Sequence, residues 1–225
     1  MKKTIGFTAI LILLLASCKT DKKETKASIA TPELTILEQV AQANGYENWK
    51  KVNELKFTFN VDRDTTHFER SWVWKPKTNE VTSITKEDTI TYLRKNRDST
   101  LTKTDAGFIN DKYWLLAPFQ LVWDAKGFEF THTAESEAPI SKKPMQKLSI
   151  VYDNEGGYTP GDAYDFYFGE DYVIQEWVFR KENQEEPSMV TTWEDYTTIN
   201  GIKIAKSHKM DGQKFDLNFT EIHIN

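Results

Sequence analysis

Residues 191–224 read TTWEDYTTINGIKIAKSHKMDGQKFDLNFTEIHI. Asn200-Gly201 and Asp211-Gly212 are dipeptides preferred in two-residue hairpin turns, because the turn positions take a positive φ. These turns divide the stretch into three predicted antiparallel strands: 191–198, 202–210 and 213–224. The apolar residues of the third strand change faces near Thr220-Glu221, which predicts a β-bulge at that point.

Apolar and polar residues also alternate through most of the preceding sequence, which is the period of a half-buried strand. The pattern predicts further strands at 55–59, 68–74, 81–84, 90–93, 128–133, 148–152, 162–168, 172–180 and 189–196. The last of these overlaps the first strand of the meander. About eleven antiparallel strands therefore follow one another along the chain.

Two segments depart from this alternation and predict helices. Thr31 is the expected N-cap of a first helix that stops at Gly45, and residues 46–52 add a turn. Residues 105–124 are densely apolar without alternation, and Pro118 disfavours one uninterrupted helix. We expect two short helices there, or a helix and an apolar loop.

The predicted fold is mainly β with helices (α+β), an incomplete antiparallel barrel of about eleven strands. A sheet of this length must roll up to bury its apolar face, and its open edges need cover. The N-terminal helix and the central helical insert are the elements expected to cap it.

Composition limits the classes of partner. The 225 residues carry a formal net charge of −5, and 13% of them are aromatic, which favours strands and large apolar surfaces. A mildly acidic chain without a basic stripe binds nucleic acid poorly, so we expect no nucleic-acid partner. The single cysteine allows no intramolecular disulfide.

The N-terminus predicts export. Lys2 and Lys3 precede an apolar run, Phe7–Ala16, which is shorter than the roughly 20 residues that span a bilayer. Leu15-Ala16-Ser17-Cys18 then resembles the lipobox of bacterial lipoproteins, in which the cysteine becomes the lipidated first residue. We therefore expect a signal peptide at residues 1–17 and lipid on Cys18; the alternative is an ordinary signal peptide with a chance cysteine.

Residues 18–30 are polar and charged, as in a flexible tether, and precede a single domain at 31–225. Lys19, and not Asp, follows the cysteine, which resembles outer-membrane sorting in enteric lipoproteins. The expected protein is a monomer attached to a membrane by lipid on Cys18, in the envelope of a Gram-negative bacterium and most simply on its outer membrane.

Two quoted stretches carry a family resemblance. Residues 165–177 read DFYFGEDYVIQEW, a strand, an acidic turn and a strand, and residues 191–204 add a Tyr followed by Asn-Gly-Ile. This order is similar to the later half of the lipoprotein-carrier superfamily of LolA and LolB. The resemblance implies an incomplete barrel capped by helices, with an apolar cavity that takes acyl chains.

The aromatic strands and the apolar insert together indicate a ligand cavity, with the insert as its lid or plug. Plain core packing explains the insert equally well. The candidate wall or lid residues are Trp72, Trp74, Tyr113, Trp114, Leu116, Phe119, Trp123, Phe166, Phe168 and Trp177.

No catalytic pattern is present. The sequence lacks Gly-x-Ser-x-Gly and a phosphate-binding glycine loop, so we predict no enzyme, no catalytic residue and no cofactor. We also predict no metal site, although calcium at a turn-rich acidic cluster stays an alternative. That cluster comprises Asp153, Glu155, Asp162 and Asp165.

The function expected from the sequence is that of an envelope lipoprotein with an apolar ligand, a lipid or acyl chain, in its half-barrel. The first alternative is an interaction or scaffolding lipoprotein whose barrel is filled by its own side chains. The second is a hydrolase or metalloprotein, which requires histidines or carboxylates from distant strands to meet in one cleft.

Overall fold

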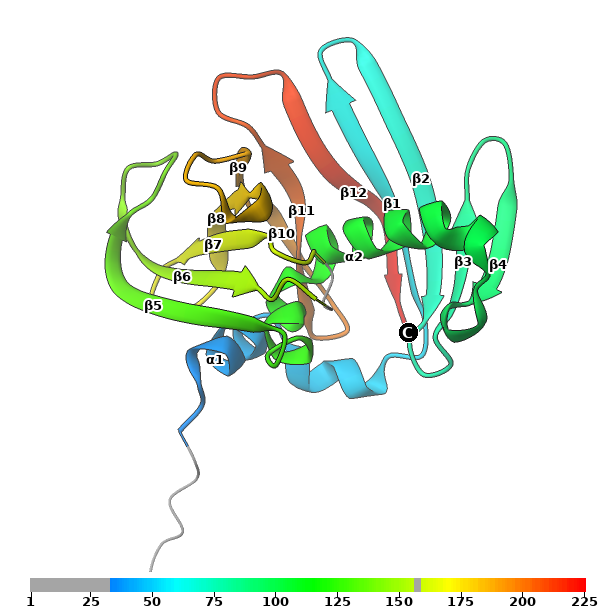
Figure 1. The fold of residues 1–225 in the computed structure, drawn as a ribbon, viewed down its shortest axis with the longest axis horizontal. Helices are drawn as coiled ribbons and strands as arrows, with labels where there is room; N and C mark the ends of the chain where they lie inside the picture. Colours follow the sequence, from blue (N-terminus) through cyan, green and yellow to red (C-terminus); the bar gives the residue numbers. More distant parts are fainter. Residues whose placement is uncertain (1–32, 156–158) are drawn as a thin grey trace, which may run out of the picture. The chain divides into compact units, whose positions relative to one another are not determined.

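A computed structural model describes residues 33–155 and 159–225 (Figure 1), and the described residues contain twelve strands in two antiparallel sheets. The seven-stranded sheet has the order β10 (Glu194–Ile199), β11 (Ile202–Lys209), β12 (Phe215–Ile224), β1 (Leu55–Arg63), β2 (Thr66–Lys75), β3 (Glu80–Ile84) and β4 (Thr89–Leu93). The five-stranded sheet has the order β5 (Phe128–Glu137), β6 (Pro144–Tyr152), β7 (Ala163–Phe168), β8 (Ile174–Arg180) and β9 (Met189–Thr192). Neither sheet closes, so the mainly β, open fold is confirmed.

Two α-helices accompany the sheets, α1 (Ile36–Ala43) and α2 (Thr102–Trp123). The short 3-10 helices are η1 (Tyr46–Lys51), η2 (Arg94–Asn96), η3 (Ser99–Leu101) and η4 (Lys181–Asn183). The N-terminal helix, the turn after it and the central insert thus correspond to α1, η1 and α2.

The predicted strand 189–196 is wrong in one respect, because it is two strands in different sheets. β9 ends at Thr192 on the edge of the five-stranded sheet, and β10 begins at Glu194 on the edge of the seven-stranded sheet. Trp193 donates its backbone N–H to Gln175 O at 2.7 Å, and Asp195 has a φ of +54°. The chain changes sheets here without a loop, so the sequence offers no turn signal.

α1 begins later than predicted. Its N-cap is Thr35, whose hydroxyl accepts from Glu38 N at 3.3 Å while Glu38 Oε2 accepts from Thr35 N at 2.8 Å. This capping box fixes the start of the helix, whereas Thr31 lies outside the described residues. The predicted stop is confirmed, since the helix ends at Ala43 and Gly45 has a φ of +82°.

α2 spans 22 residues and consists of two helical segments that meet at a kink. Leu116 departs from helical geometry, with φ −125° and ψ 25°, two residues before Pro118. Proline has no N–H to donate and its ring clashes with the preceding turn, which accounts for the local distortion. The first of the two predicted arrangements, two short helices that meet near Pro118, is therefore confirmed, and the second, a helix followed by an apolar loop, is wrong.

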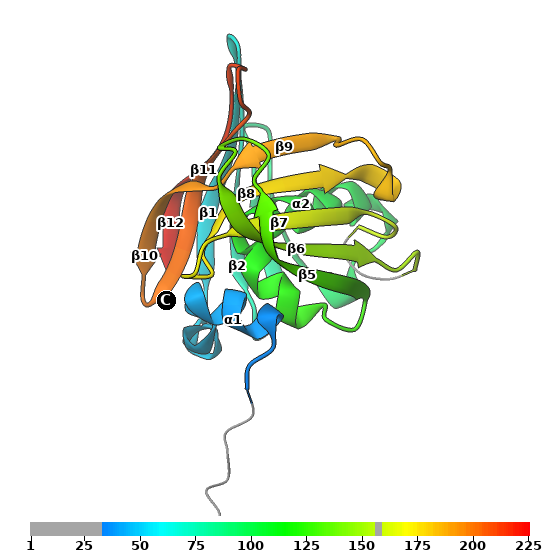
Figure 2. The same ribbon diagram turned by 90° about the vertical axis from the view of Figure 1, so that its left-hand side faces the viewer.

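α2 lies between the two sheets, as Figures 1 and 2 show together. On one side, Phe108 packs edge-on against Trp72 and Trp74 of β2, with ring centroids 5.5 and 5.6 Å apart. On the other side, Tyr113 contacts Tyr164 of β7 at 4.9 Å. The insert is thus a buried middle layer and part of the apolar core.

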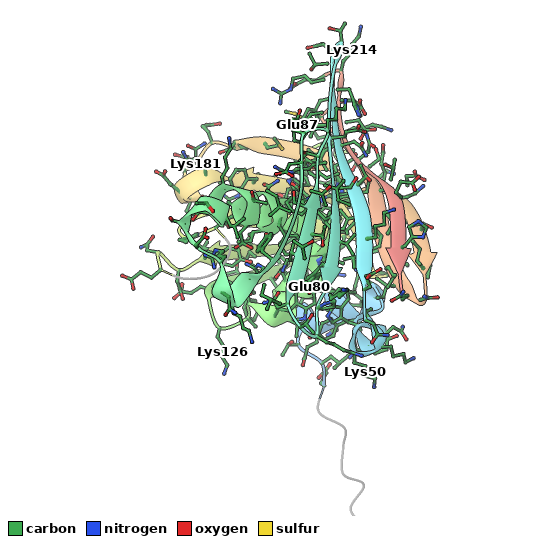
Figure 3. All side chains as sticks on the ribbon, turned by 90° about the vertical axis from the view of Figure 1, so that its right-hand side faces the viewer. Lys50, Glu80, Glu87, Lys126, Lys181 and Lys214 are labelled. Carbon is green, nitrogen blue, oxygen red and sulfur yellow. The ribbon has the colours of Figure 1, made fainter. Side chains whose placement is uncertain are left out.

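Charged side chains cover the outside, including those labelled in Figure 3 such as Lys50 and Lys126. Within the described residues, no helix combines the length and apolar character needed to cross a bilayer. The predicted signal peptide, Cys18 and the tether lie outside the described residues.

Candidate functional site

A cavity of about 380 Å³ lies between α2 and the five-stranded sheet. Its helical side is formed by Ala106, Ile109, Asn110, Tyr113 and Trp114. Its sheet side is formed by Tyr164, Trp177, Phe179 and Met189, with Thr159 and Asp162 beside them. Ala106 and Asn110 are exposed, whereas Tyr113, Trp114, Tyr164 and Trp177 are buried, so the cavity runs inward from the surface.

The spacing of residues along α2 brings together the side chains on the helical side of the cavity. Ala106, Ile109, Asn110 and Tyr113 stand three, four and seven residues apart, which places them on one face of α2. Strand pairing across β7, β8 and β9 brings together the side chains on the sheet side of the cavity, because directly opposite residues share a face of the sheet. Tyr164 pairs with Phe179, which in turn pairs with Met189.

The inner part of the cavity is an aromatic wall, formed by Tyr113, Trp114, Tyr164, Trp177 and Phe179. The ring centroids of Tyr164 lie 5.3 Å from Trp177 and 5.2 Å from Phe179, and those of Trp114 and Trp177 lie 4.2 Å apart. Such aromatic contacts add to the free energy gained from burial. The wall offers a continuous apolar surface to a ligand.

The hydroxyl groups in the wall are uncharged. Burial raises the pKa of the Tyr113 phenol well above its usual range, and burial likewise raises the pKa of Tyr164. Tyr164 donates to Thr159 Oγ1 at 3.0 Å, and the hydroxyl groups of Tyr113 and Tyr152 lie 3.3 Å apart. The wall therefore suits an uncharged or apolar molecule better than an ion.

Buried ion pairs hold α2 against the seven-stranded sheet. Arg70 Nε and Nη2 donate to the two oxygens of Asp111 at 2.5 and 2.6 Å, and Trp72 Nε1 donates to Asp111 Oδ2 at 2.7 Å. Nearer the helix N-terminus, Arg94 Nε donates to Asp105 Oδ1 at 2.7 Å. Because both carboxylates face the larger sheet, the opposite face of α2 is free to line the cavity.

The structure separates the ten predicted site residues into three groups. Tyr113, Trp114 and Trp177 line the cavity. Trp74 and Trp123 lie instead beside a smaller hollow of about 250 Å³ on the other side of α2. The remaining five belong to the buried core: Trp72, Leu116, Phe119, Phe166 and Phe168.

Sequence reasoning missed Ile109, Tyr164, Phe179 and Met189 as lining residues. The alternation within 162–168 indicated that Tyr164 shares an inward face of its strand with Phe166 and Phe168. Ile109 lies four residues before Tyr113, so helical spacing places it on the same face of α2. Phe179 and Met189 lie at strand ends with no motif. Their place depends on the register between β8 and β9.

Lys112 was also not anticipated. It is 2% exposed, and its Nζ lies 5.0 Å from the Trp74 ring centroid and 5.3 Å from that of Trp123. With the Gln120 amide oxygen turned toward it, Lys112 donates to Gln120 at 3.1 Å. Burial lowers the pKa of Lys112 to about 7, and the positive charge of Arg94 acts in the same direction.

The acidic cluster considered for calcium is divided. Asp165 forms an ion pair with Arg180, and Asp162 Oδ1 accepts the backbone N–H of Glu182 at 2.8 Å. Over the described ranges, 33–155 and 159–225, no three His, Cys, Asp or Glu side chains are grouped so that they surround a metal ion. The observed partners of these two aspartates are those of structural turns and ion pairs.

No protein-family model matches the chain, and no curated protein matches it in sequence. Among solved structures, a DUF1329 family protein from Desulfovibrio piger is similar, with a TM-score of 0.51 and 9% identity over 84% of this chain and 92% of that chain. A LolA superfamily protein from Nitrosomonas europaea has a TM-score of 0.50 and 8% identity, with the same coverage of both chains. At such low identity the likeness concerns the fold, and it shows that this chain has the LolA-like fold that the sequence resemblance implied.

Proposed function

We propose that this protein binds one apolar molecule, a lipid or acyl chain, in the cavity between α2 and the five-stranded sheet. The observation that carries the proposal is the aromatic wall, which offers an uncharged apolar surface reaching inward from the exposed Ala106 and Asn110. The LolA-like fold supports a carrier rather than a catalytic role. No step of bond making or breaking is part of the proposal.

The size of the cavity favours one chain over several. Its volume of about 380 Å³ lies near the lower end of the roughly 300–1,000 Å³ typical of small-ligand sites. At about 30 Å³ for each water-sized group, it holds on the order of a dozen such groups. A single acyl chain fits this volume, whereas a triacylated lipoprotein anchor does not.

The proposed place of action is the cell envelope. The signal peptide at 1–17 and the lipobox cysteine Cys18 support export and attachment to a membrane, and Lys19 supports the outer one. A carrier held near a bilayer meets lipids at high local concentration. The proposed role is therefore the handling of lipids or lipoproteins within the envelope.

The first test is whether a ligand accompanies the protein. Native mass spectrometry of protein purified from its own host should show a bound apolar species, and lipid extraction should identify its class. The Ala106→Trp variant adds a large ring beside the cavity and should reduce the bound fraction at least severalfold.

Lys103→Trp is the matched control, since Lys103 lies exposed in the first turn of α2 and does not line the cavity. It should leave binding unchanged. Repeated recovery of ligand-free protein, together with no effect of Ala106→Trp on the uptake of any apolar probe, is the result that contradicts the proposal.

A scaffolding role is the second candidate. The observation in its favour is that five of the ten candidate residues pack into the core, which supports a half-barrel filled by its own side chains. The exposed edge strand β5, on which Phe130 is 44% exposed, offers a surface for a protein partner. A pull-down from envelope fractions that recovers one stoichiometric partner through β5, with the cavity empty, decides for this role.

A further inference from the structure

Two rings of the aromatic wall, Trp114 and Trp177, form a closed circuit with two rings that lie behind the wall, Trp193 and His208. Trp114 contacts Trp177 at 4.2 Å between ring centroids, and Trp177 contacts Trp193 at 5.6 Å. Trp193 contacts His208 of β11 at 4.6 Å, and His208 contacts Trp114 at 5.2 Å. These four side chains, here called the buried ring cluster, join α2 to both sheets.

The cluster adjoins the cavity but reaches deeper. Trp114 and Trp177 line the cavity, whereas Trp193 and His208 do not. Trp193 is 3% exposed and His208 is fully buried. Trp114 is therefore a partition, with the cavity on one side and His208 on the other.

Polar atoms without partners are concentrated in this place. Six buried side-chain nitrogen and oxygen atoms of the described residues make no hydrogen bond of normal geometry, and five of them belong to the cluster and its neighbour Thr191. The five are Nε1 of Trp177, Nε1 of Trp193, both ring nitrogens of His208 and Oγ1 of Thr191. Thr191 pairs directly with Trp177 across β8 and β9, so its hydroxyl shares the inward face.

Buried polar groups in folded proteins are paired in the large majority of cases, since an unpaired one loses its hydration without compensation. One such atom is an ordinary exception. Five around one ring circuit, next to a cavity that opens to the surface, point to a hydrogen-bonding group supplied from outside the chain.

The hydrogen-bonding properties of the five atoms indicate which kind of external group fits the site. Indole nitrogens only donate, and the threonine hydroxyl both donates and accepts. Burial lowers the pKa of His208 to about 3, against a smaller opposing effect of the Thr192 backbone, so its ring is neutral and donates through one nitrogen. The site is rich in donors and therefore suits an oxygen acceptor.

A full charge does not suit the site. In the part of the chain that the structure describes, none of the ion pairs or cation–π contacts involves the cluster, so a carboxylate there has no counter-charge. The acceptor that fits is an uncharged oxygen, such as a hydroxyl, an ester carbonyl or an amide carbonyl.

We propose that the ligand site continues past Trp114 into the buried ring cluster, and that its ligand is a single-chain amphiphile with an uncharged oxygen-bearing end. That end accepts hydrogen bonds from the indole N–H groups of Trp177 and Trp193, and the apolar chain occupies the cavity. In this proposal, movement of the Trp114 ring makes room for the oxygen-bearing end beside these N–H groups. This inference rests on the proposed function and adds the class of ligand to it.

The test compares dodecanol, dodecane and dodecanoate as competitors for the apolar fluorophore N-phenylnaphthylamine on the purified full chain. Dodecanol should compete about tenfold more strongly than dodecane, because two additional hydrogen bonds form. Dodecanoate, measured well above its own pKa, should compete more weakly than dodecanol.

Variants locate the preference. The double variant Trp177→Phe, Trp193→Phe keeps aromatic rings but removes both indole donors, and it should bind dodecanol and dodecane with equal affinity. Trp123→Phe removes an indole donor outside the cluster and should keep the full preference.

Indole resonances of the unmodified protein give a measurement that needs no variant. In 15N-labelled protein, the Nε1–H signals of Trp177 and Trp193 should shift on addition of dodecanol and shift less on addition of dodecane. The signal of Trp123 should stay in place in both titrations.

The outcomes separate this inference from the proposed function. Equal competition by dodecanol and dodecane, with unmoved indole signals, overturns the inference and leaves an apolar cavity without polar recognition. Failure of all three competitors and of the fluorophore to bind overturns both.

Discussion

Arg70 on β2 and Asp111 on α2 form the buried ion pair that sets the position of the helix. Asp111 is fully buried, and its oxygens also accept from Trp72 and Asn110. A carboxylate so placed depends on its cation, because its own hydration has been removed. The pair determines which face of α2 is left for the cavity.

Replacement of Arg70 by Met should destabilise the fold by about 3–5 kcal/mol, the range found when one partner of a buried pair is removed. Urea denaturation followed by tryptophan fluorescence measures the loss. Lys75→Met is the control on the same strand, since Lys75 pairs with Glu80 at an exposed site and should change stability little. Equal losses in the two variants would show that the buried pair does not hold the helix.

Lys112 makes the stability of the fold depend on pH in the neutral to alkaline range. Burial places its pKa near 7 in the folded chain, below its ordinary value of 10.5, so the unfolded chain binds the extra proton between these two values. The cost of burying Lys112 is therefore greatest near and below pH 7 and disappears as the pH rises past 10.5.

Lys112→Met should accordingly raise the free energy of unfolding by up to about 4 kcal/mol near pH 7, and by about 1 kcal/mol near pH 10. Denaturant titrations at both pH values give the comparison. Lys126→Met, at the exposed position labelled in Figure 3, should show no such pH-dependent difference. A gain for Lys112→Met that is independent of pH would contradict this reasoning.

The sequence predicted that the apolar insert contributes residues to the site, but not which side of the helix each one faces. Tyr113 and Trp114 face the cavity, whereas Trp123 lies beside the smaller hollow. The sequence alone does not distinguish the directions in which adjacent aromatic residues of α2 point, because the buried ion pairs fix the rotation of the helix about its axis. The available signal for that rotation was the presence of Asp105 and Asp111 within a largely apolar run, because a carboxylate buried there needs a cation from a neighbouring element.

At the scale of elements, α1 and the turn after it rest on the hairpin between β10 and β11. Asn44 O accepts the backbone N–H of Lys203 at 3.0 Å, and Asn48 Nδ2 donates to Gly201 O at 3.2 Å. A Cβ placed on Gly45 would lie 1.9 Å from Gly201 O. The helix can approach this hairpin only because residue 45 has no side chain.

Gly45→Ala should cost more than about 2 kcal/mol, because the positive φ alone costs roughly 1–2 kcal/mol and the clash with Gly201 adds to it. Gly212→Ala is matched in conformation, with a φ of +67°, but a Cβ there meets nothing within 4 Å. Its cost should be limited to the conformational part. Thermal unfolding of both variants makes the comparison, and similar losses would mean that the close approach contributes nothing.

Elements with local signals were predicted well. The bulge expected near Thr220-Glu221 is confirmed, because Glu221 has a φ of +51° and the register with β1 shifts at that point. The split of 189–196 into β9 and β10 was missed, since no glycine or proline marks it. A strand that crosses from one sheet to another keeps its alternation, so only tertiary pairing shows the change.

At the scale of the molecule, the predicted lipid anchor and the fold are separate in the sequence. Cys18 lies outside the described residues, while the core is formed by residues from Leu37 onward. The Cys18→Ser variant should therefore keep the thermal unfolding midpoint of the wild type and move from the membrane to the soluble envelope fraction. Loss of cooperative unfolding in this variant would show that Cys18 and the domain are not independent.

The fold class followed from alternation and turn dipeptides, and the apolar insert led us to expect a cavity, but the size of the cavity did not follow from the sequence. Its volume depends on the separation between α2 and the five-stranded sheet, which is a property of packing and not of any one segment. A sequence pattern reports which residues face inward, and it does not report whether the space they face is filled.

The pairing of β1 with both β2 and β12 has a consequence for the timing of folding. Leu55 lies opposite Ile224, so a central strand of the seven-stranded sheet lacks one neighbour until residues 215–224 have been made. Contacts of such long sequence separation form slowly, because a large loop must close before they are gained. For a chain with a predicted signal peptide, this order delays completion of the seven-stranded sheet until β12 has been synthesised, which leaves time for export before the sheet is complete.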